Sequence, residues 1–311
     1  MAVFVNTNYS ALQGQRYLGN VQNQLTTTYQ RLSSGMRINS AKDDAAGLQI
    51  ADRLTSQING LNQGNRNASD GIALAQTAEA GMDEISGMLQ KIRTLAVQAN
   101  NGTNTLEDRK ALAKEASSLA TEISRISKQT TFAGKTILNG KQANAFMTAA
   151  QGQEGKTQTL QLQVGSNKGD TISFDLVNLQ FSVAGQAAGI AADQFKDAAG
   201  TAAFLVKNSE VSVNFSTIGA VQNIISYMDQ MIGYVDSQRA DLGAIQNRLE
   251  SSIRNQSNVA ANEADARSRI RDADFAEESA NLSQQSIIQQ AAASMLMQAN
   301  TRPQLGLSLL G

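Results

Sequence analysis

The charged stretch at residues 31–53, RLSSGMRINSAKDDAAGLQIADR, contains the adjacent carboxylates Asp43 and Asp44. Two neighbouring carboxylates can share the work of general acid and general base in an enzyme. They also suit the first turn of a helix, where the helix dipole stabilises negative charge. Because Ser40-Ala41-Lys42-Asp43 has the form of a capping box with Ser40 as the N-cap residue, we favour a helix start over a catalytic dyad.

The composition removes most other catalytic chemistry. The 311 residues include no His and no Cys, which excludes a Ser-His-Asp triad, a thiol nucleophile and a zinc site built on His or Cys. A carboxylate-only metal site or a Lys/Ser pair is left open, but no spacing indicates one. The turn GSNKGD at residues 165–170 lacks the G-x-x-x-x-G-K-[ST] pattern of a phosphate loop. We therefore predict a protein that is not an enzyme, with no cofactor and no metal.

The net charge and the hydropathy of the chain limit the classes of partner that it can bind. The net charge is −1, which gives no attraction to nucleic acid or to an anionic membrane. No stretch approaches the roughly 18 apolar residues that span a bilayer, and the N-terminal residues lack the basic and apolar regions of an ordinary signal peptide. Composition alone favours a soluble, helical, cytoplasmic protein with neither nucleic-acid nor membrane partners.

The elements around the acidic pair are helices at both ends of the chain. The apolar spacing predicts one helix over residues 10–32, which stops near Gly35, because glycine readily follows a helix end. It predicts another from Phe275 to about Asn300, ending before Pro303. The apolar positions that we assign to terminal coiled-coil assembly are Leu18, Leu25, Leu32, Ile288 and Met295.

The clearest helical pattern lies between residues 71 and 100. A turn at residues 101–104 and a further amphipathic segment predict an antiparallel helical hairpin. The apolar seam repeats with 3-4 spacing at Ala75, Ala78, Met82, Ile85, Leu89, Ile92, Ala96 and Ala99.

Residues 159–176 alternate apolar and polar side chains about a glycine-rich turn, which predicts a β-hairpin. Residues 177–217 lack a sustained period, and we expect a small irregular insert with one short helix and one strand. Helical spacing then returns from Ile218 to about Glu263.

We therefore predict a mainly α fold. It is a long antiparallel helical bundle or coiled coil with paired N- and C-terminal helices, plus a β-hairpin and a small irregular central insert. The exposed apolar stripes on its helices call for partners, and self-assembly is the natural inference.

Several long motifs resemble those of bacterial flagellin. They are NTNYSALQGQRYL, the stretch at residues 31–53, LQKIRTLAVQANNGT, LQVGSNKGDTISFDL and the ending from SRIRDADFAEES to LGLSLLG. The resemblance covers residues 1–176 and 218–311. It implies a structural subunit that self-assembles into the helical flagellar filament for swimming motility. Larger family members carry two outer domains where this chain has its short insert.

The resemblance also implies three domains. Residues 1–40 with 270–311 would form an inner terminal coiled-coil domain that lines the central channel. Residues 41–176 with 218–269 would form an outer-tube helical domain that includes the β-hairpin 159–176. Residues 177–217 would be a short variable insert. The stretch at 31–53 would then be the interdomain joint, with joint residues Gly35, Arg37, Ser40, Asp43 and Asp44. We expect its charges at Arg31, Arg37, Lys42 and Arg53 to help fix the angle between the domains.

Partners and location follow from the same resemblance. Flagellins are exported unfolded through the flagellar type III apparatus, held beforehand by an export chaperone, and polymerise at the filament tip. The implied partners are further copies of the chain, the export chaperone, and the filament cap and junction proteins. The implied location is extracellular, in the flagellar filament, without a cleaved signal peptide.

Family members are also sensed by a Toll-like receptor of the innate immune system. The matching positions in this chain are Gln90, Lys91, Leu95 and Glu115. The chain departs from the family's more familiar motif, which has Arg where Lys91 stands and Glu where Thr94 stands. Lysine does not reproduce the bidentate geometry of arginine.

Two alternatives belong to other classes. A hook–filament junction protein shares the same terminal coiled coil. Some flagellins carry a metalloprotease insert, but that enzyme needs H-E-x-x-H, and this chain has no His.

Overall fold

The computed structural model describes residues 7–140, 157–195, 203–207 and 210–308. The chain divides into two compact units. Unit 1 comprises Met1–Asn59 and Val259–Gly311, and unit 2 comprises Gly60–Asn258. Helices α2 (Ala45–Ala99) and α5 (Ile218–Arg271) contribute residues to both units.

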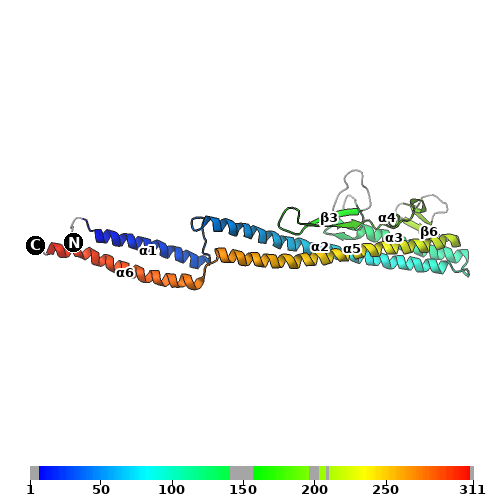
Figure 1. Cartoon of the computed structure of the whole chain (residues 1–311). Coiled ribbons are helices and arrows are strands. Elements are labelled where there is room, and N and C mark those ends of the chain that lie inside the picture. The colour runs from blue at the N-terminus through cyan, green and yellow to red at the C-terminus, as the bar shows by residue number, and fades with distance from the viewer. Residues whose placement is uncertain (1–6, 141–156, 196–202, 208–209, 309–311) are drawn as a thin grey trace. The chain divides into compact units, whose positions relative to one another are not determined.

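In unit 1, helix α1 (Tyr9–Ser34) lies antiparallel beside α6 (Phe275–Ser308) (Figure 1). The predicted pairing of the two chain ends is therefore confirmed. The Asn8 side-chain oxygen accepts a hydrogen bond of 3.1 Å from the Ala11 N–H, which caps the start of α1. Gly35 follows the helix with a left-handed φ of 70°, as expected for a residue just past a helix end.

Three predicted helix limits are wrong. Helix α2 begins at Ala45, so Ser40 is not its N-cap; the cap is Asp44, whose Oδ1 accepts a 2.9 Å hydrogen bond from the Gly47 N–H. Helix α5 continues past Glu263 to Arg271. Helix α6 runs through Pro303 to Ser308, since one missing N–H removes a single rung of a long helix.

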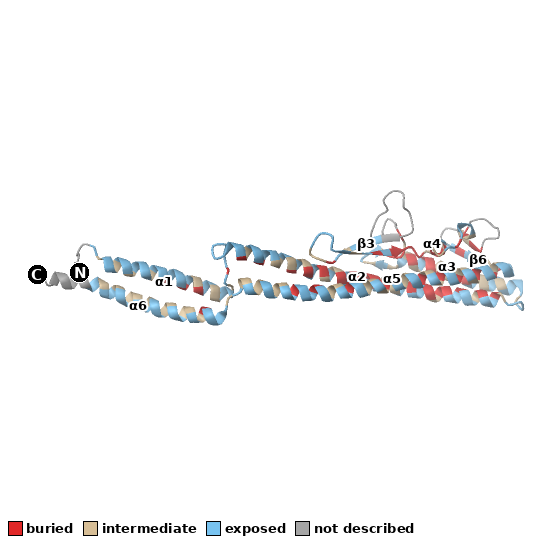
Figure 2. Cartoon of the chain, in the orientation of Figure 1, coloured by how far each residue is buried: buried red, intermediate tan, exposed pale blue. Residues whose placement is uncertain are grey.

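Unit 2 holds the hydrophobic core. The predicted apolar seam of α2 is confirmed, because all eight residues are at most 1% exposed. Helix α3 (Leu106–Gln129) turns back beside α2, and a capping box between Thr105 and Asp108 closes its first turn (Figure 1). Figure 2 shows buried residues gathered along these helices and α5 in unit 2.

The predicted β-hairpin is also confirmed. Strand β3 (Thr157–Gln163) pairs antiparallel with β4 (Thr171–Val177), with Leu160 opposite Phe174. A two-residue pair, β1 (Thr131–Phe132) and β2 (Lys135–Thr136), follows α3.

The described part of the insert contains more order than the sequence predicted. Its elements are helix α4 (Phe181–Ala187), the 3₁₀ turn η1 (Ala192–Phe195), and strands β5 (Phe204–Lys207) and β6 (Glu210–Val213), which form a second hairpin. The rings of Phe181 and Phe195 each lie 5.2 Å from that of Phe204. Strand β6 packs on α3, and the Val213 N–H donates to Ser117 Oγ at 2.8 Å. The insert thus completes the core of unit 2.

Glycines in α2 allow the β3–β4 hairpin to approach the helix backbone. A Cβ atom at Gly64 would lie 2.0 Å from the Val164 carbonyl oxygen, and one at Gly71 would lie 2.2 Å from Leu162 Cδ1. Between them, Asn67 Nδ2 donates a 2.9 Å hydrogen bond to the Gln163 carbonyl. The chain at Val164 therefore needs the absence of a side chain at residue 64, whereas at Gly71 the flexible end of Leu162 is what a side chain would displace.

We predict that Gly64→Ala destabilises the protein although alanine favours helices. The new methyl group would meet backbone, which has to shift, and such overpacking costs about 1–3 kcal/mol. Gly87→Ala is the matched control in the same helix. No atom lies within 4 Å of a Cβ at Gly87, so this change should stabilise by about 0.5–1 kcal/mol. Denaturant unfolding of both variants measures the difference, and equal effects would refute the close approach.

Candidate functional site: the paired terminal helices and their joint

The α1–α6 interface is held by a series of polar pairs. The pairs are Arg31 Nη1 to Glu278 Oε1 at 3.0 Å, Thr28 Oγ1 to Gln285 Oε1 at 3.2 Å, and Gln289 Nε2 to Gln22 Oε1 at 2.7 Å. Glu278 and Thr28 are buried, as are the apolar Val21 and Leu25 on α1. The Glu278 carboxylate of this ion pair is shielded from water, whereas the Arg31 side chain is 31% exposed. This interface combines a narrow apolar strip with directional bonds.

The residues assigned to terminal assembly fall into two groups. Leu25 is buried and Leu18 and Leu32 are half-buried in the α1–α6 pair. Ile288 and Met295 are exposed, at 41% and 69%. Neither Ile288 nor Met295 is therefore buried in the α1–α6 pair. The assembly role of Ile288 and Met295 stays a prediction.

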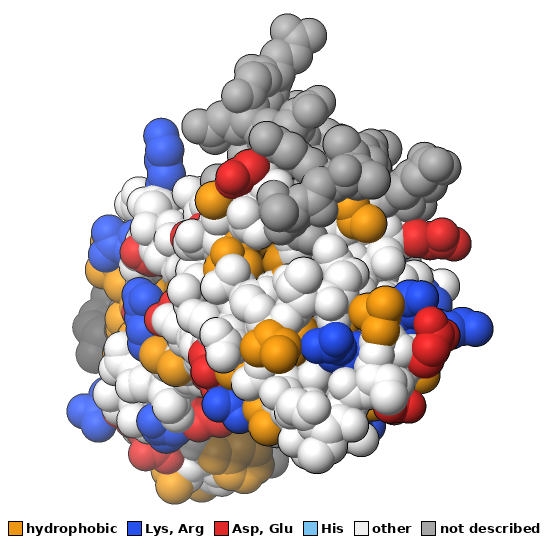
Figure 3. Space-filling model, turned by 90° about the vertical axis from the view of Figure 1, so that its right-hand side faces the viewer, with side chains coloured by type: hydrophobic (Ala, Val, Ile, Leu, Met, Phe, Trp, Pro, Cys, Tyr) orange, Lys and Arg blue, Asp and Glu red, His pale blue; other side chains and the backbone are white. Residues whose placement is uncertain are grey.

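Exposed apolar side chains gather on unit 1. Among the described residues, 14 large apolar side chains are exposed, and 11 of them belong to unit 1. These are Tyr9, Leu12, Tyr17, Tyr29, Ile50, Val259, Phe275, Ile287, Ile288, Met295 and Met297. The core clusters of the described residues lie in unit 2. On the end of unit 2 seen in Figure 3, hydrophobic side chains lie singly among charged and polar ones.

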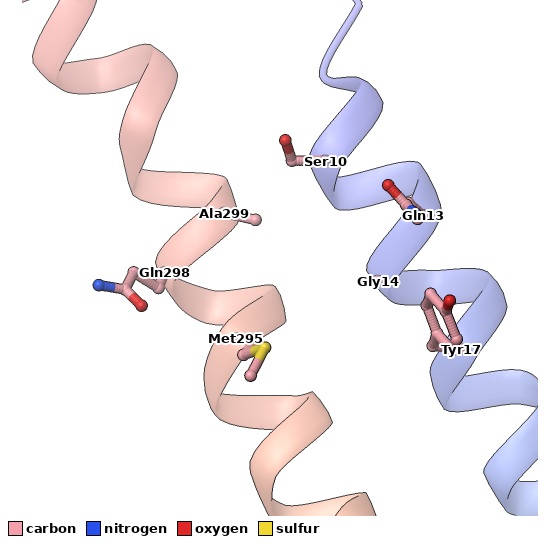
Figure 4. A pocket seen from close by; sticks show the side chains of 7 residues that line it. All are labelled: Ser10, Gln13, Gly14, Tyr17, Met295, Gln298 and Ala299. Carbon is pink, nitrogen blue, oxygen red and sulfur yellow. The ribbon is translucent and has the colours of Figure 1, made fainter.

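A shallow groove runs between α1 and α6 near the chain ends. Its volume is about 310 Å³, and Tyr17 and Met295 face each other's helix across it (Figure 4). Gly14 lines the same groove, and a Cβ atom there would lie 3.3 Å from Leu296 Cδ1. The groove lacks acidic clusters or basic residues, so it offers apolar contact rather than chemistry.

The joint is a crossing of two chain segments within unit 1. Met36 and Asp272 form an antiparallel bridge. The Arg37 N–H donates to the Arg271 carbonyl at 2.7 Å, and Arg37 Nη2 donates to the Ile270 carbonyl at 2.6 Å. Gly35 accepts from the Ala273 N–H at 3.0 Å. The end of α1 is thereby bonded to the segment that precedes α6.

The carboxylates of Asp43 and Asp44 accept hydrogen bonds from backbone N–H groups rather than forming a catalytic dyad. Asp43 Oδ2 accepts from the N–H groups of Asn39 and Ser40, at 3.1 and 2.9 Å, and from Ser40 Oγ at 3.1 Å. The backbone hydrogen bond from Ser40 is the main cause of a lowered pKa for Asp43. A carboxyl group held ionised in this way is a poor general acid.

The positions matched to the innate receptor motif lie on two helices of unit 2. Gln90 and Lys91 on α2 and Glu115 on α3 are exposed, whereas Leu95 is half-buried against the core. Their role stays a prediction.

Sequence reasoning missed the polar pairs between α1 and α6. The only sequence feature that indicated these pairs was the high Gln and Thr content of both terminal segments. That content does not show which side chain pairs with which. Within the described residues, no group of three or more acidic side chains could hold a metal ion, and no helix is long and apolar enough to cross a membrane.

Comparison with known proteins gives a consistent result. Residues 5–143 match the family model for the bacterial flagellin N-terminal helical region, and residues 225–310 match that for the C-terminal helical region. The chain is 36% identical to polar flagellin C of Vibrio parahaemolyticus and 37% identical to flagellin A of Vibrio cholerae, over alignments that cover all of each chain. A solved structure of a putative flagellar hook-associated protein from Vibrio parahaemolyticus covers 74% of this chain and 100% of its own, with a TM-score of 0.54 and 15% identity, and shows a similar fold.

We predict that the turn at residues 39–43 loosens in acid. The pKa of Asp43 in the folded chain lies below its ordinary value of 3.8. Its stabilisation is therefore complete well above pH 3.8 and is lost as the pH falls through the lower, folded pKa. Amide protection at Ser40, corrected for intrinsic exchange, should follow this titration, and Asp43→Asn should weaken it at neutral pH.

Asp44→Asn is the control, because asparagine also caps helices. It should leave the protection of the Ser40 amide unchanged. A midpoint for the wild-type chain at or above pH 3.8 would contradict the hydrogen bonds assigned to Asp43.

Proposed function

Because the chain belongs to the bacterial flagellin family, we propose that its paired terminal helices are the surface through which it self-assembles into the helical flagellar filament for swimming. It is a structural protein rather than an enzyme. The observation that carries the assembly surface is the concentration of exposed apolar side chains on unit 1.

Burial of these side chains supplies the free energy of assembly. Fully burying an exposed Ile, Met or Phe side chain is worth about 1.5–3 kcal/mol. Two such side chains in one contact therefore change an association constant by at least a hundredfold, since 1.4 kcal/mol is a factor of ten. Unit 1 presents them on both paired helices, including Tyr17 on α1 and Met295 on α6.

We assign residues 1–40 with 270–311 to the inner domain, 41–176 with 218–269 to the outer tube, and 177–217 to the insert. The joint supports these limits, because α1 ends and α6 begins beside it. The compact units divide elsewhere, at Asn59 and Val259, since α2 and α5 continue without interruption through the proposed domain limits.

Export is proposed to occur in the unfolded state through the flagellar type III apparatus, with an export chaperone before it and the cap and junction proteins at the filament. The proposed location of the filament is extracellular. Two features support this route. The chain has no Cys, so no disulfide resists unfolding, and the described part of unit 1 has few buried apolar residues to separate.

Recognition by the innate Toll-like receptor is proposed at Gln90, Lys91, Leu95 and Glu115. Exposure of three of these side chains supports it. Leu95 would take part through its exposed portion, because the rest packs on the core.

The hook–filament junction protein is the second candidate. The fold it shares with this chain does not separate the two, since the likeness at 15% identity concerns the fold alone. Whole-chain identity to flagellins favours the filament subunit. The two candidates differ in behaviour, because a junction protein stops at one ring.

We predict that purified chain seeded with filament fragments elongates into long fibres. Ile288→Gln combined with Met295→Gln should raise the critical concentration at least tenfold, because two apolar contacts are lost. Glutamine is a good helix former, so α6 should persist. Electron microscopy and sedimentation measure the fibres.

Ile218→Gln is the matched control, since Ile218 in unit 2 is 47% exposed and Ile288 is 41% exposed. It should elongate like the wild-type chain. Assembly limited to single rings would favour the junction protein, and unimpaired elongation of the double variant would reject the surface on α6.

We predict that Lys91→Arg raises receptor activation by about three- to tenfold. Arginine offers two parallel donors to a carboxylate where lysine offers a point charge. A reporter cell line that carries the receptor measures the response to monomer. Lys110→Arg, an exposed change on α3, should leave it unaltered, and equal responses to all three proteins would place recognition elsewhere.

A further inference from the structure

Helix α6 contains a proline in a place where it frees a backbone carbonyl. In an α-helix the N–H of one residue donates to the carbonyl four residues earlier. Residue 303 is proline, which has no N–H, and α6 continues through it. The Ala299 carbonyl therefore lacks its helical donor. The chain has one proline in all, so this kind of vacancy occurs at one position of α6.

The side chain of Asn8 supplies the missing hydrogen-bond donor to the Ala299 carbonyl. Its Nδ2 donates a 2.8 Å hydrogen bond to the Ala299 carbonyl. Its Oδ1 accepts a 3.1 Å hydrogen bond from the Ala11 N–H at the start of α1. One amide thus satisfies an orphan donor of the first helix and an orphan acceptor of the last.

Away from the joint and the Arg31–Glu278 ion pair, the contacts of α1 with α6 leave the register near the chain ends open to slippage. Gln and Thr side chains hold much of the interface, and glutamines recur along α6 at residues 284, 285, 289 and 290. A shift by one turn would bring other polar partners together. A shift would also move Asn8 away from the carbonyl that Pro303 frees, because neighbouring carbonyls in the helix already have donors.

We propose that Asn8 determines the register of the α1–α6 pair, by recognising the Ala299 carbonyl that Pro303 leaves free. Isolated polar residues set register in the same way within coiled coils. This inference concerns pairing within one chain. It goes beyond the proposed filament function and holds whether or not the chain polymerises.

The absence of cysteine makes register directly measurable. A Cβ atom at Gly14 would lie 3.8 Å from Leu296 Cβ, which is close to the mean separation of about 3.8 Å in disulfides. Gly14→Cys with Leu296→Cys therefore reports the observed register. Gly14→Cys with Ala292→Cys reports a slip by one turn, because four residues span about 6 Å along a helix.

We predict that Asn8→Asp lowers cross-linking of the first cysteine pair about three- to tenfold and raises that of the second. Aspartate still caps α1 but cannot donate to the Ala299 carbonyl. Intramolecular disulfide formation in the dilute full-length monomer, followed on non-reducing gels, gives both rates. Circular dichroism should show unchanged helix content.

The same cross-linking is then measured in chains that also carry Pro303→Ala. This substitution restores the N–H at residue 303, so the Ala299 carbonyl regains its helical donor. In that background Asn8→Asp should change either cross-link by less than twofold. The proposal is overturned if Asn8→Asp lowers cross-linking of the first cysteine pair equally with and without Pro303→Ala. It is also overturned if Asn8→Asp lowers nothing in the chain that keeps Pro303. Filament elongation plays no part in this test, so failure of the filament proposal would leave the result unaffected.

Discussion

Two helices that lie side by side can bury only one strip of each, and unit 1 depends on this constraint. Among its described residues, the buried apolar side chains are few, and two of them are alanines. Such a pair gains little free energy from burial alone. Its stability has to come from directional bonds, above all the Arg31–Glu278 ion pair and the hydrogen bonds of the joint. The apolar side chains that the pair does not bury stay in water, which is the condition for assembly with further copies.

Unit 2 buries more than one strip of its helices, because more elements pack together there. Helices α2, α3 and α5 share one core, and the β3–β4 hairpin and the insert cover it. Close approach requires glycine where the hairpin meets α2, and the polar Asn67 then bonds to a strand carbonyl. Most of its large apolar side chains are consequently buried, and few remain exposed. Stability within the chain and capacity for assembly are therefore divided between the two units.

Much of this fold could be predicted from the sequence because the spacing of apolar residues indicates which face of a helix or strand is buried. The seam from Ala75 to Ala99 and the β-hairpin follow from spacing, and the pairing of the chain ends was predicted from the helices at both ends of the chain. The insert was harder, since Phe181 and Phe204 meet only after the chain has folded back and no local period joins them.

The joint shows why the candidate site could be predicted only in part. Asp43 accepts from the Ser40 N–H, which is half of a capping box, but the Asp43 N–H donates to the Ser40 carbonyl and closes a turn. Asp44, the residue after Asp43, caps the helix instead. Local patterns of this kind identify which groups bond without fixing where the helix begins. The polar partners across α1 and α6 carried still less signal, because each belongs to the opposite end of the chain.

The choice of polar side chains between α1 and α6 has a physical consequence. An interface of leucines would bind more tightly but would tolerate several registers and several partners, because apolar burial is not directional. The Arg31–Glu278 ion pair gives less free energy and requires a particular neighbour. Apolar side chains such as Ile288 and Met295 are instead left exposed. Within unit 1, polar contacts therefore define how the chain pairs with itself, while apolar surface is left for pairing with others.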